Sequence, residues 1–285
     1  MTTIIDGRKI SADIRGEVAE GISKMKAETG TTPGLAVIIV GEDPGSQIYV
    51  RNKEKACAEV GVYSEKHELP DSTTEEELLA LVNRLNADPK IHGLLVQLPL
   101  PKHINEDKII DAIDVRKDVD GFTPVNVGNM LIGKDCFLPC TPHGIIVLLE
   151  RCGIDINGKD AVIVGRSNIV GKPSAILLMH RNATVTICHS RTKDLSAHTS
   201  RADILVVGIG KAKMIKADMI KEGAAIIDAG INRNDEGKVV GDVDYDDCFE
   251  KAGAITPVPG GVGMMTVAML MYNTLEAARK QTSSN

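Results

Sequence analysis

Aromatic residues are scarce in this chain of 285 residues: they make up 2% of it, and tryptophan is absent. Any core must therefore be built from Ile, Val, Leu, Ala and Met. The sequence also lacks a basic cluster with interleaved aromatics, and its net charge is −6. Both features argue against a nucleic-acid-binding surface. A hydrophobic fraction of 43% is ample for a core, and the length favours two domains over one.

Cysteine patterns that would indicate a metal centre are also missing. The six cysteines lie at positions 57, 136, 140, 152, 188 and 248. No two of them form C-x-x-C, and no nearby histidine completes a zinc pattern. We therefore expect no metal and reduced, mostly buried thiols, as in a cytoplasmic protein.

The sequence shows neither a signal peptide nor a convincing membrane span. Its first residues have no charged segment followed by an apolar one, so we expect no signal peptide. The uncharged run from Ala254 to Leu275 is nominally long enough to cross a bilayer. Prolines and glycines crowd its first half, and only Val262 to Tyr272 is apolar enough to be helical. A loop followed by a buried helix is the better interpretation, and we expect no membrane association.

Strand-like and helix-like runs alternate along most of the chain. This alternation predicts the α/β class with mostly parallel sheets. Two blocks are visible, at about 1–120 and 140–255, with a Gly- and Pro-containing stretch, Gly121 to Pro142, between them. The expected strands lie near 35–40, 64–69, 94–96, 161–164, 184–188, 203–207 and 225–228. The expected helices lie at 47–60 with Ser46 as N-cap, at 73–85 with Thr73 or Thr74 as cap, at 144–151 and at about 264–279, the last packing on either block.

The most informative segment runs from Val162 to Pro173. An apolar, β-branched run ends in Gly165, crosses a short polar loop and enters a helix start. This layout places backbone N–H groups and a positive helix end against a dinucleotide pyrophosphate. It departs from G-x-G-x-x-G, because Ser167 occupies the second glycine position and the next glycine is Gly171. An ordinary tight turn with solvated basic residues would have the same spacing.

The following apolar run indicates which dinucleotide would bind. An NAD-binding chain should carry an acidic residue about 20 residues after the glycine motif. Here the run Val185–Cys188 ends instead in His189, Ser190, Arg191 and Thr192. A hydroxyl and a guanidinium suit a 2′-phosphate, so we expect NADP rather than NAD.

In the first block, polar residues gather where ligands bind in parallel sheets, beyond the carboxyl ends of the strands. Tyr49 and Lys53 are four residues apart and share a helix face. A desolvated lysine there could transfer protons, although helical spacing alone favours a surface lysine lying over a tyrosine. Gln97 ends an apolar strand and needs a partner, either backbone or ligand. One of Asp118 and Asp120 could anchor a polar heterocycle, or both could belong to a solvated turn.

The loop from Thr256 to Gly263 combines two prolines with three glycines. Its prolines make it rigid, and its glycines could let backbone approach a ligand closely. A simple long connection is the alternative interpretation.

Together these segments resemble the bifunctional methylenetetrahydrofolate dehydrogenase/methenyltetrahydrofolate cyclohydrolase family. The resemblance runs in the family's order from about residue 5 to residue 279, and this combination of motifs is highly specific. It is carried by Val40–Lys53, Val96–Pro101, Lys117–Phe122, Pro139–Pro142, Gly165–Pro173 and Pro257–Gly263.

The resemblance implies a fold, a reaction and an assembly. It implies two α/β domains, the second a Rossmann-like NADP-binding domain with a mostly parallel sheet, and an active-site cleft between them. The folate-binding domain would comprise 1–120 plus 265–285, and the NADP-binding domain 121–264. The family oxidises 5,10-methylenetetrahydrofolate with NADP, hydrolyses the methenyl product to 10-formyltetrahydrofolate, and forms homodimers.

The resemblance also implies residue roles. Lys53 would handle protons in the hydrolysis, with Gln97 tuning it. Tyr49 would stack on the folate, and Asp120 would hold its pterin-like ring. The implied cofactor contacts are Gly165, Arg166, Ser167, Gly171, Ser190 and Arg191, with the backbone of Ile231 near the nicotinamide and Thr141 as a further neighbour. Pro259, Gly260 and Gly261 would line the folate side.

The chain departs from the family pattern at two positions. Met264 follows Gly263 where the family usually has proline, which could loosen the folate side, and Gly45 stands where alanine is usual. Two other functions are carried as alternatives: a different NADP oxidoreductase acting on a small acid or amino acid, and a non-catalytic dinucleotide sensor. The set of Tyr49, Lys53, Gln97 and Asp120 argues against the first, and retention of Lys53 argues against the second.

Overall fold

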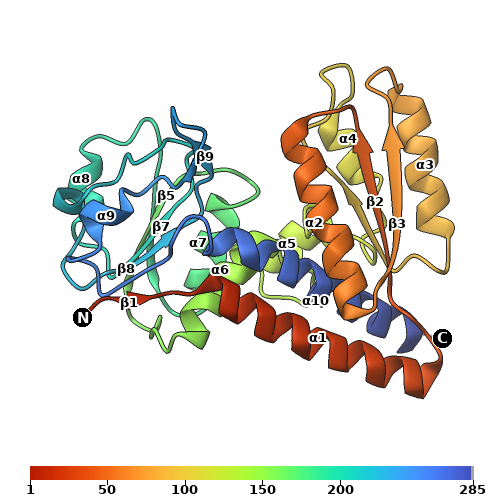
Figure 1. Cartoon of the computed structure of the whole chain (residues 1–285), viewed down its shortest axis with the longest axis horizontal. Coiled ribbons are helices and arrows are strands. Elements are labelled where there is room, and N and C mark those ends of the chain that lie inside the picture. Colours follow the sequence, from red (N-terminus) through yellow and green to blue (C-terminus); the bar gives the residue numbers. More distant parts are fainter. Residues whose placement is uncertain (284–285) are drawn as a thin grey trace. The chain divides into compact units, whose positions relative to one another are not determined.

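The computed structural model describes residues 1–283, and its contacts divide the chain into two compact units (Figure 1). Unit 1 comprises residues 1–11 and 141–266, and unit 2 comprises residues 12–140 and the chain from Val267 onward. This grouping differs from the predicted domain boundaries at both ends of the first domain. Residues 1–11 belong to unit 1, because strand β1 (Thr3–Ile4) pairs with β11 (Ala254–Ile255). Residues 121–140 belong to unit 2. The final two residues of the predicted 265–285 segment lie outside the described residues.

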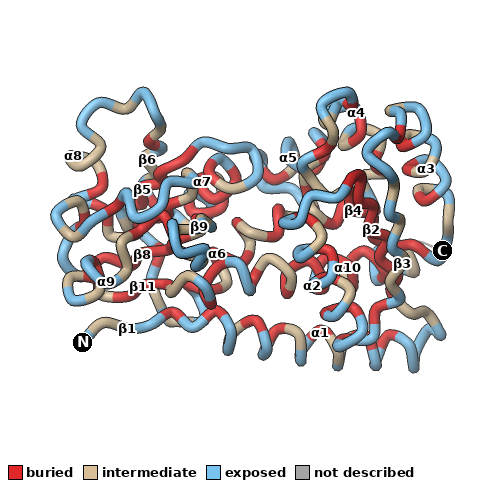
Figure 2. The backbone as a smooth tube through the Cα atoms, turned by 45° about the horizontal axis from the view of Figure 1, so that its top comes forward, coloured by how far each residue is buried: buried red, intermediate tan, exposed pale blue. Residues whose placement is uncertain are grey.

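Unit 2 contains a three-stranded parallel sheet in the order β3-β2-β4. All seven residues of the central strand β2 (Gly34–Val40) are buried, as Figure 2 shows. Its aliphatic side chains pack with those of α3 and β4 in one apolar cluster. The other elements are α1 (Gly7–Thr29), which begins in unit 1, α2 (Pro44–Val60), β3 (Tyr63–Leu69), α3 (Glu75–Ala87), β4 (Gly93–Val96), α4 (Glu106–Asp111), α5 (Pro124–Leu131) and α10 (Val262–Ser283), which also begins in unit 1.

Unit 1 contains a six-stranded parallel sheet in the order β1-β11-β8-β7-β5-β6. Strands β5, β7, β8 and β11 are short apolar runs buried on both faces, which is typical of parallel sheets. The two edge strands, β1 and β6, are more exposed. The remaining elements are α6 (Cys140–Arg151), β5 (Asp160–Val164), α7 (Gly171–Met179), β6 (Thr184–Cys188), α8 (Leu195–Thr199), β7 (Ile204–Val207), η1 (Ala217–Met219), β8 (Ala225–Asp228), the antiparallel pair β9 (Asn232–Arg233) and β10 (Val239–Val240), and α9 (Tyr245–Cys248). The predicted α/β class with parallel sheets is confirmed.

Several predicted helix boundaries were wrong. Helix α2 begins at Pro44, and its N-cap is Asp43, whose carboxylate accepts a hydrogen bond from the N–H of Ser46 at 2.7 Å. The helix begins at Pro44 because proline suits the first helical position. Ser46 therefore lies inside the helix and is not its N-cap. Helix α6 begins at Cys140, and α10 continues to Ser283. The pattern predicted no element where α1 and α5 lie.

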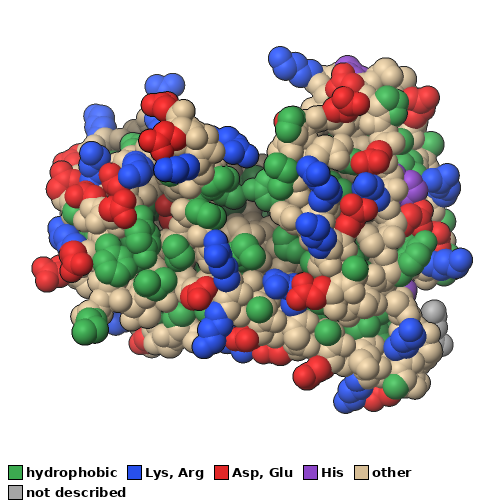
Figure 3. Space-filling view, viewed as in Figure 1, with side chains coloured by type: hydrophobic (Ala, Val, Ile, Leu, Met, Phe, Trp, Pro, Cys, Tyr) green, Lys and Arg blue, Asp and Glu red, His purple; other side chains and the backbone are tan. Residues whose placement is uncertain are grey.

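All six cysteines are free thiols, buried or partly buried. Across residues 1–283, no group of three or more His, Cys, Asp or Glu side chains is arranged to hold a metal ion. Within the same residues, no helix is long and apolar enough to cross a membrane. On the face drawn in Figure 3, both units carry Lys and Arg side chains interspersed with Asp and Glu.

Candidate active site

Lys53 lies on the buried face of α2, and only 8% of it is exposed. Its Nζ donates a hydrogen bond to Oε1 of Gln97 at 2.9 Å. Burial lowers the pKa of the Lys53 ammonium, and the nearby Asp120 carboxylate opposes that shift. The interpretation of Lys53 as a solvated surface lysine is therefore wrong.

The sheet of unit 2 explains why Lys53 and Gln97 meet. Gln97 directly follows β4, and its N–H donates to the carbonyl of Ile38 in β2 at 2.8 Å. Helix α2 follows β2 through a short loop, so both side chains lie beyond the carboxyl ends of neighbouring parallel strands. The amide of Gln97 is oriented by its own Nε2, which donates to the carbonyl of Leu98 at 2.8 Å. Its oxygen consequently faces the lysine.

Tyr49 lies one turn before Lys53 on the same helix. It is 38% exposed, so its ring is accessible to a planar ligand. Burial of the rest of the side chain raises the pKa of its phenol. The ring therefore stays neutral at physiological pH.

Asp118 and Asp120 differ in their hydrogen-bonding partners. Asp118 is buried, and its carboxylate accepts from the N–H groups of Phe122 and Thr123, from the Thr123 hydroxyl at 2.7 Å and from Nδ2 of Asn126 at 2.8 Å. It holds the loop together. Among residues 1–283, the carboxylate of Asp120 accepts one side-chain hydrogen bond, a long one from Sγ of Cys140 at 3.7 Å. Desolvation raises the pKa of Asp120, and Lys53 opposes that shift.

The backbone that carries Asp120 is fixed from helix α10. Nδ2 of the buried Asn273 donates to the carbonyls of Val119 at 2.8 Å and Leu138 at 3.0 Å. Asn273 is a positioning residue that the sequence reasoning missed. The available signal was a polar residue among the apolar positions of the last helix.

In unit 1, the predicted dinucleotide turn joins β5 to α7. Gly165 has φ +131°, and a Cβ there would collide with the carbonyl oxygen of Gly208. A Cβ on Gly171 would collide in turn with the carbonyl oxygen of Gly165. The hydroxyl of Ser167 accepts from the N–H groups of Val170 at 3.1 Å and Gly171 at 3.3 Å. Thus Ser167 closes the turn that a second glycine would otherwise shape, while residues 166–169 remain exposed.

The expected 2′-phosphate residues follow the neighbouring strand. Because Val164 of β5 pairs with Cys188 of β6, the loop after β6 emerges beside the Gly165 turn. Ser190 and Arg191 are both exposed in that loop. The N–H of His189 donates to the hydroxyl of Thr192 at 2.8 Å and closes it. An exposed turn, a helix start and an exposed guanidinium at one sheet edge fit a phosphorylated dinucleotide.

The proline–glycine loop also lies in unit 1. Gly260 has φ +117°, and its carbonyl accepts from the N–H of Arg8 at 3.1 Å, at the start of α1. A Cβ on Gly261 would come within 2.7 Å of the carbonyl oxygen of Pro257. These glycines serve close packing within the unit. Pro259, Gly260 and Gly261, which were predicted to line the folate side, thus belong to unit 1 together with the predicted cofactor residues. The other predicted folate residues, Tyr49 and Asp120, belong to unit 2.

Ile231 and Thr141 complete the predicted set in unit 1. Ile231 is 51% exposed, and its side chain would lie 3.7 Å from a Cβ on Gly263. The hydroxyls of Thr141 and Thr266 are hydrogen-bonded at 2.8 Å. Ile231 lies in the loop between β8 and β9, whereas Thr141 lies in the first turn of α6 and is tied to the start of α10.

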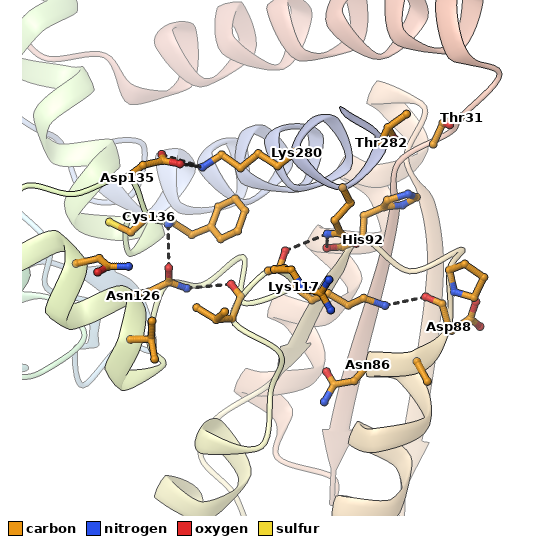
Figure 4. A pocket seen from close by; sticks show the side chains of 18 residues that line it. Thr31, Asn86, Asp88, His92, Lys117, Asn126, Asp135, Cys136, Lys280 and Thr282 are labelled. Carbon is orange, nitrogen blue, oxygen red and sulfur yellow. Dashed lines mark hydrogen bonds and ion pairs between the residues drawn. The ribbon is translucent and has the colours of Figure 1, made fainter. Parts of the chain in front are cut away.

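A pocket of about 720 Å³ in unit 2 contains none of these residues (Figure 4). Its buried Lys117 donates to the carbonyls of Leu85 at 3.0 Å and Asp88 at 2.7 Å, at the end of α3. Its Lys280 is paired with Asp135 at 2.7 Å. Both cations are paired with groups of the protein itself, and the pocket contains none of the residues predicted to bind folate or NADP.

Two family models match the chain. The tetrahydrofolate dehydrogenase/cyclohydrolase catalytic domain matches residues 5–120, and the NAD(P)-binding domain of the same family matches residues 139–282. The chain belongs to the tetrahydrofolate dehydrogenase/cyclohydrolase family. The family inferred from the motifs is thereby confirmed, as is an NAD(P)-binding second domain in a two-domain α/β fold.

Individual relatives agree over nearly the whole chain. The bifunctional protein FolD of Moorella thermoacetica is 64% identical over 277 residues, covering 97% of this chain and 99% of that protein. The structure of the bifunctional FolD enzyme of Campylobacter jejuni is 50% identical, with a TM-score of 0.97 over 99% of this chain and all of that one. The Trypanosoma brucei enzyme, complexed with NADP cofactor and an inhibitor, is 39% identical, with a TM-score of 0.94 and 98% of each chain covered.

Proposed function

We propose that this chain oxidises 5,10-methylenetetrahydrofolate with NADP and hydrolyses the methenyl product to 10-formyltetrahydrofolate. These are the two activities of the family to which it belongs. The observation that carries the proposal is the buried amine of Lys53, held by the neutral amide of Gln97 at 2.9 Å with the carboxylate of Asp120 nearby. A solvated lysine paired with a carboxylate would be a poor proton acceptor at neutral pH.

In the hydrolysis, a water molecule adds to the cationic methenyl carbon, and a new carbon–oxygen bond forms. Lys53 in its neutral form accepts the proton that the water loses. The new hydroxyl then loses its proton as the formyl C=O forms, and the bond from that carbon to N5 of the folate breaks. N5 takes up a proton, the formyl group remains on N10, and one proton is released overall. The amide oxygen of Gln97 accepts a hydrogen bond from one N–H of the amine. The lone pair of the neutral amine therefore points away from Gln97.

Tyr49 and Asp120 hold the folate in this scheme. The accessible ring of Tyr49 offers a stacking surface for a planar heterocycle. The carboxylate of Asp120 accepts hydrogen bonds from ring N–H groups, since Asp118 already supplies the internal hydrogen bonds of the loop. Neither residue needs to exchange a proton during the oxidation.

The cofactor residues act by binding and orientation. Gly165, Arg166, Ser167 and Gly171 hold the pyrophosphate at the start of α7, while Ser190 and Arg191 hold the 2′-phosphate. Ile231 and Thr141 border the nicotinamide end. When bound, NADP accepts a hydride from the one-carbon bridge, and the protein's contribution to that step is positioning.

A coupled assay tests the proposal. The protein is incubated with 5,10-methylenetetrahydrofolate and NADP while NADPH and methenyl absorbance are followed together. We expect NADPH to form without methenyl accumulation. NADP binding without NADPH formation would favour a sensor, and turnover of a small hydroxy or amino acid in its place would favour a different oxidoreductase.

The choice of NADP over NAD is tested at Arg191. Arg191→Ala removes the charge-assisted hydrogen bonds to a 2′-phosphate. We expect it to weaken transition-state binding with NADP by about 1.5–3 kcal/mol, or roughly 10- to 100-fold in kcat/KM. The rate with NAD should change little. The matched control is Lys193→Ala, an exposed cation two residues on. Equal loss with both cofactors in Arg191→Ala would contradict a role in phosphate recognition.

Two further expectations from the family resemblance belong to the same proposal: a homodimer in the cytoplasm. Sedimentation equilibrium of the purified chain measures the first directly. A mass of twice the monomer across a dilution series supports it, and a monomer at every concentration contradicts it.

A further inference from the structure

Asp242 is fully buried, and its carboxylate accepts hydrogen bonds from three consecutive backbone N–H groups. These are the N–H groups of Ile209 at 2.6 Å, Gly210 at 3.0 Å and Lys211 at 2.6 Å. They belong to the loop that leaves the carboxyl end of β7. Asp242 itself stands far along the chain, beyond β10. A single side chain therefore sets the path of this loop.

The same carboxylate holds the segment around Ile231. On one side of Ile231, Nδ2 of Asn232 donates to Oδ1 of Asp242 at 2.9 Å. On the other side, Gly230 lies against the carboxylate so closely that a Cβ there would collide with it. Ile231 is exposed between two residues that both rest on Asp242.

A second buried carboxylate fixes the first. Asp228 ends β8, and its Oδ1 accepts from the N–H groups of Gly230 at 2.9 Å and Asp242 at 3.1 Å. Its Oδ2 accepts from the N–H of Val243 at 2.8 Å. Burial of two carboxylates is costly unless their oxygens are hydrogen-bonded, and here backbone and amide N–H groups supply the partners. The arrangement specifies three loops at one edge of the sheet, which apolar side chains could not do.

We propose that Asp242, braced by Asp228, is a positioning residue that sets the nicotinamide end of the cofactor site through the loops at Ile209–Lys211 and Gly230–Asn232. This inference rests on the proposed function, which puts the backbone of Ile231 beside the nicotinamide. The 2′-phosphate end depends on Ser190 and Arg191, and within residues 1–283 their loop makes no hydrogen bond to either aspartate. The rate of hydride transfer should therefore depend on Asp242, and NADP affinity should not.

The first test uses the cofactor-free protein. Backbone amide hydrogen exchange is measured for the wild type, Asp242→Asn and the matched control Asp246→Asn, whose side chain is exposed four residues away. We expect exchange at Ile209, Gly210 and Lys211 to become at least tenfold faster in Asp242→Asn alone. Amides of the turn at 165–171 should keep their wild-type rates. Unchanged exchange at 209–211 would overturn the proposal.

The second test separates geometry from stability in a single turnover with excess NADP and 5,10-methylenetetrahydrofolate. The amplitude of NADPH formation reports the fraction of folded sites, and the rate constant reports positioning. In Asp242→Asn we expect the rate constant to fall at least tenfold, with NADP affinity within threefold and hydrolysis of 5,10-methenyltetrahydrofolate within twofold of wild type. A reduced amplitude with an unchanged rate constant would show a merely structural role and overturn the proposal.

A milder variant covers the case in which Asp242→Asn does not fold. Asn232→Ala removes one donor to the same carboxylate and leaves the two aspartates in place. We expect a threefold or larger fall in the rate constant at full amplitude, and an unchanged rate constant would overturn the proposal. If the wild type forms no NADPH, the proposed function fails together with this role, whereas an active wild type with insensitive variants contradicts only the role of Asp242.

Discussion

At the scale of single residues, hydrogen-bond partners decide which of two similar side chains is available to a ligand. Asp118 and Asp120 are indistinguishable in the sequence, yet Asp118 is saturated by the loop that follows it and Asp120 is not. Lys53 could be placed on a helix face from spacing, but its burial depends on the partner strand that brings Gln97. Sequence reasoning therefore found the chemical groups, while tertiary contacts were needed to separate their roles.

Asn273 is the residue whose removal should most directly disturb the Asp120 loop. Asn273→Ala removes the amide donor from the carbonyls of Val119 and Leu138 and leaves Val119 only the weak thiol donor of Cys140. We expect the free energy of unfolding to fall by about 2–4 kcal/mol and the KM for folate to rise. Urea denaturation and steady-state kinetics measure the two effects. The exposed Asn52→Ala should change stability by no more than about 0.5 kcal/mol, and equal losses in both variants would contradict the assignment.

At the scale of elements, apolar runs predicted strands well and helix starts poorly. Strands β2, β5, β6, β7 and β8 coincide with the predicted runs. Strands β2, β7 and β8 are buried along their whole length, and such strands need continuous apolar sequence. The start of α2 was missed because proline and glycine are typical of turns, whereas here Pro44 opens the helix. Helix α1 was missed although Ile14, Val18, Ile22 and Met25 form its buried stripe, because its mostly polar composition obscured that spacing.

Replacement of glycine by alanine should have opposite effects on stability at two positions, Gly171 in the turn before α7 and Gly16 in α1. In Gly171→Ala the new methyl group collides with the backbone of Gly165, which cannot move without displacing the strand–helix turn. We expect a loss of about 1–3 kcal/mol in stability and weaker NADP binding. Gly16 in α1 has open space around it, so Gly16→Ala should stabilise by about 0.5–1 kcal/mol. Thermal unfolding with and without NADP checks both. A neutral Gly171→Ala would contradict the close approach.

At the scale of the whole molecule, chain length predicted two domains, the alternation of strand-like and helix-like runs predicted the α/β class, and composition predicted an aliphatic core. The sequence did not indicate that residues 1–11 belong with 141–266 in unit 1, because the pairing of β1 with β11 joins segments some 250 residues apart. Such long-range pairing leaves no local pattern in the sequence. The division of residues among units was accordingly the least predictable property of the fold.

The stability of the whole protein should depend on pH through His143. Burial lowers the pKa of this imidazole to about 4, against about 6.5 in the unfolded chain. The unfolded state therefore binds the extra proton first, and His143 lowers stability as pH falls from 6.5 to 4, by about 2–3 kcal/mol. Asp228, with its pKa raised to about 6, acts in the opposite direction as pH falls from about 6 to 4, because the folded state binds this proton before the unfolded state does.

The His143 contribution is isolated by a difference. The free energy of unfolding of wild type minus that of His143→Gln should decrease as pH falls from 6.5 to 4 and be constant above 7. Urea titrations at each pH measure it. A pH-independent difference would show that the imidazole is not held neutral by burial.

The most direct measurement of the central claim is hydrolysis of 5,10-methenyltetrahydrofolate by Lys53→Met, followed by loss of methenyl absorbance. The control is Lys55→Met, an exposed lysine on the same helix. Since general acid–base catalysis contributes about 10²–10⁴-fold, we predict a loss of at least 100-fold in Lys53→Met, with NADP reduction still detectable and Lys55→Met unchanged. Hydrolysis at the wild-type rate in Lys53→Met would contradict the account.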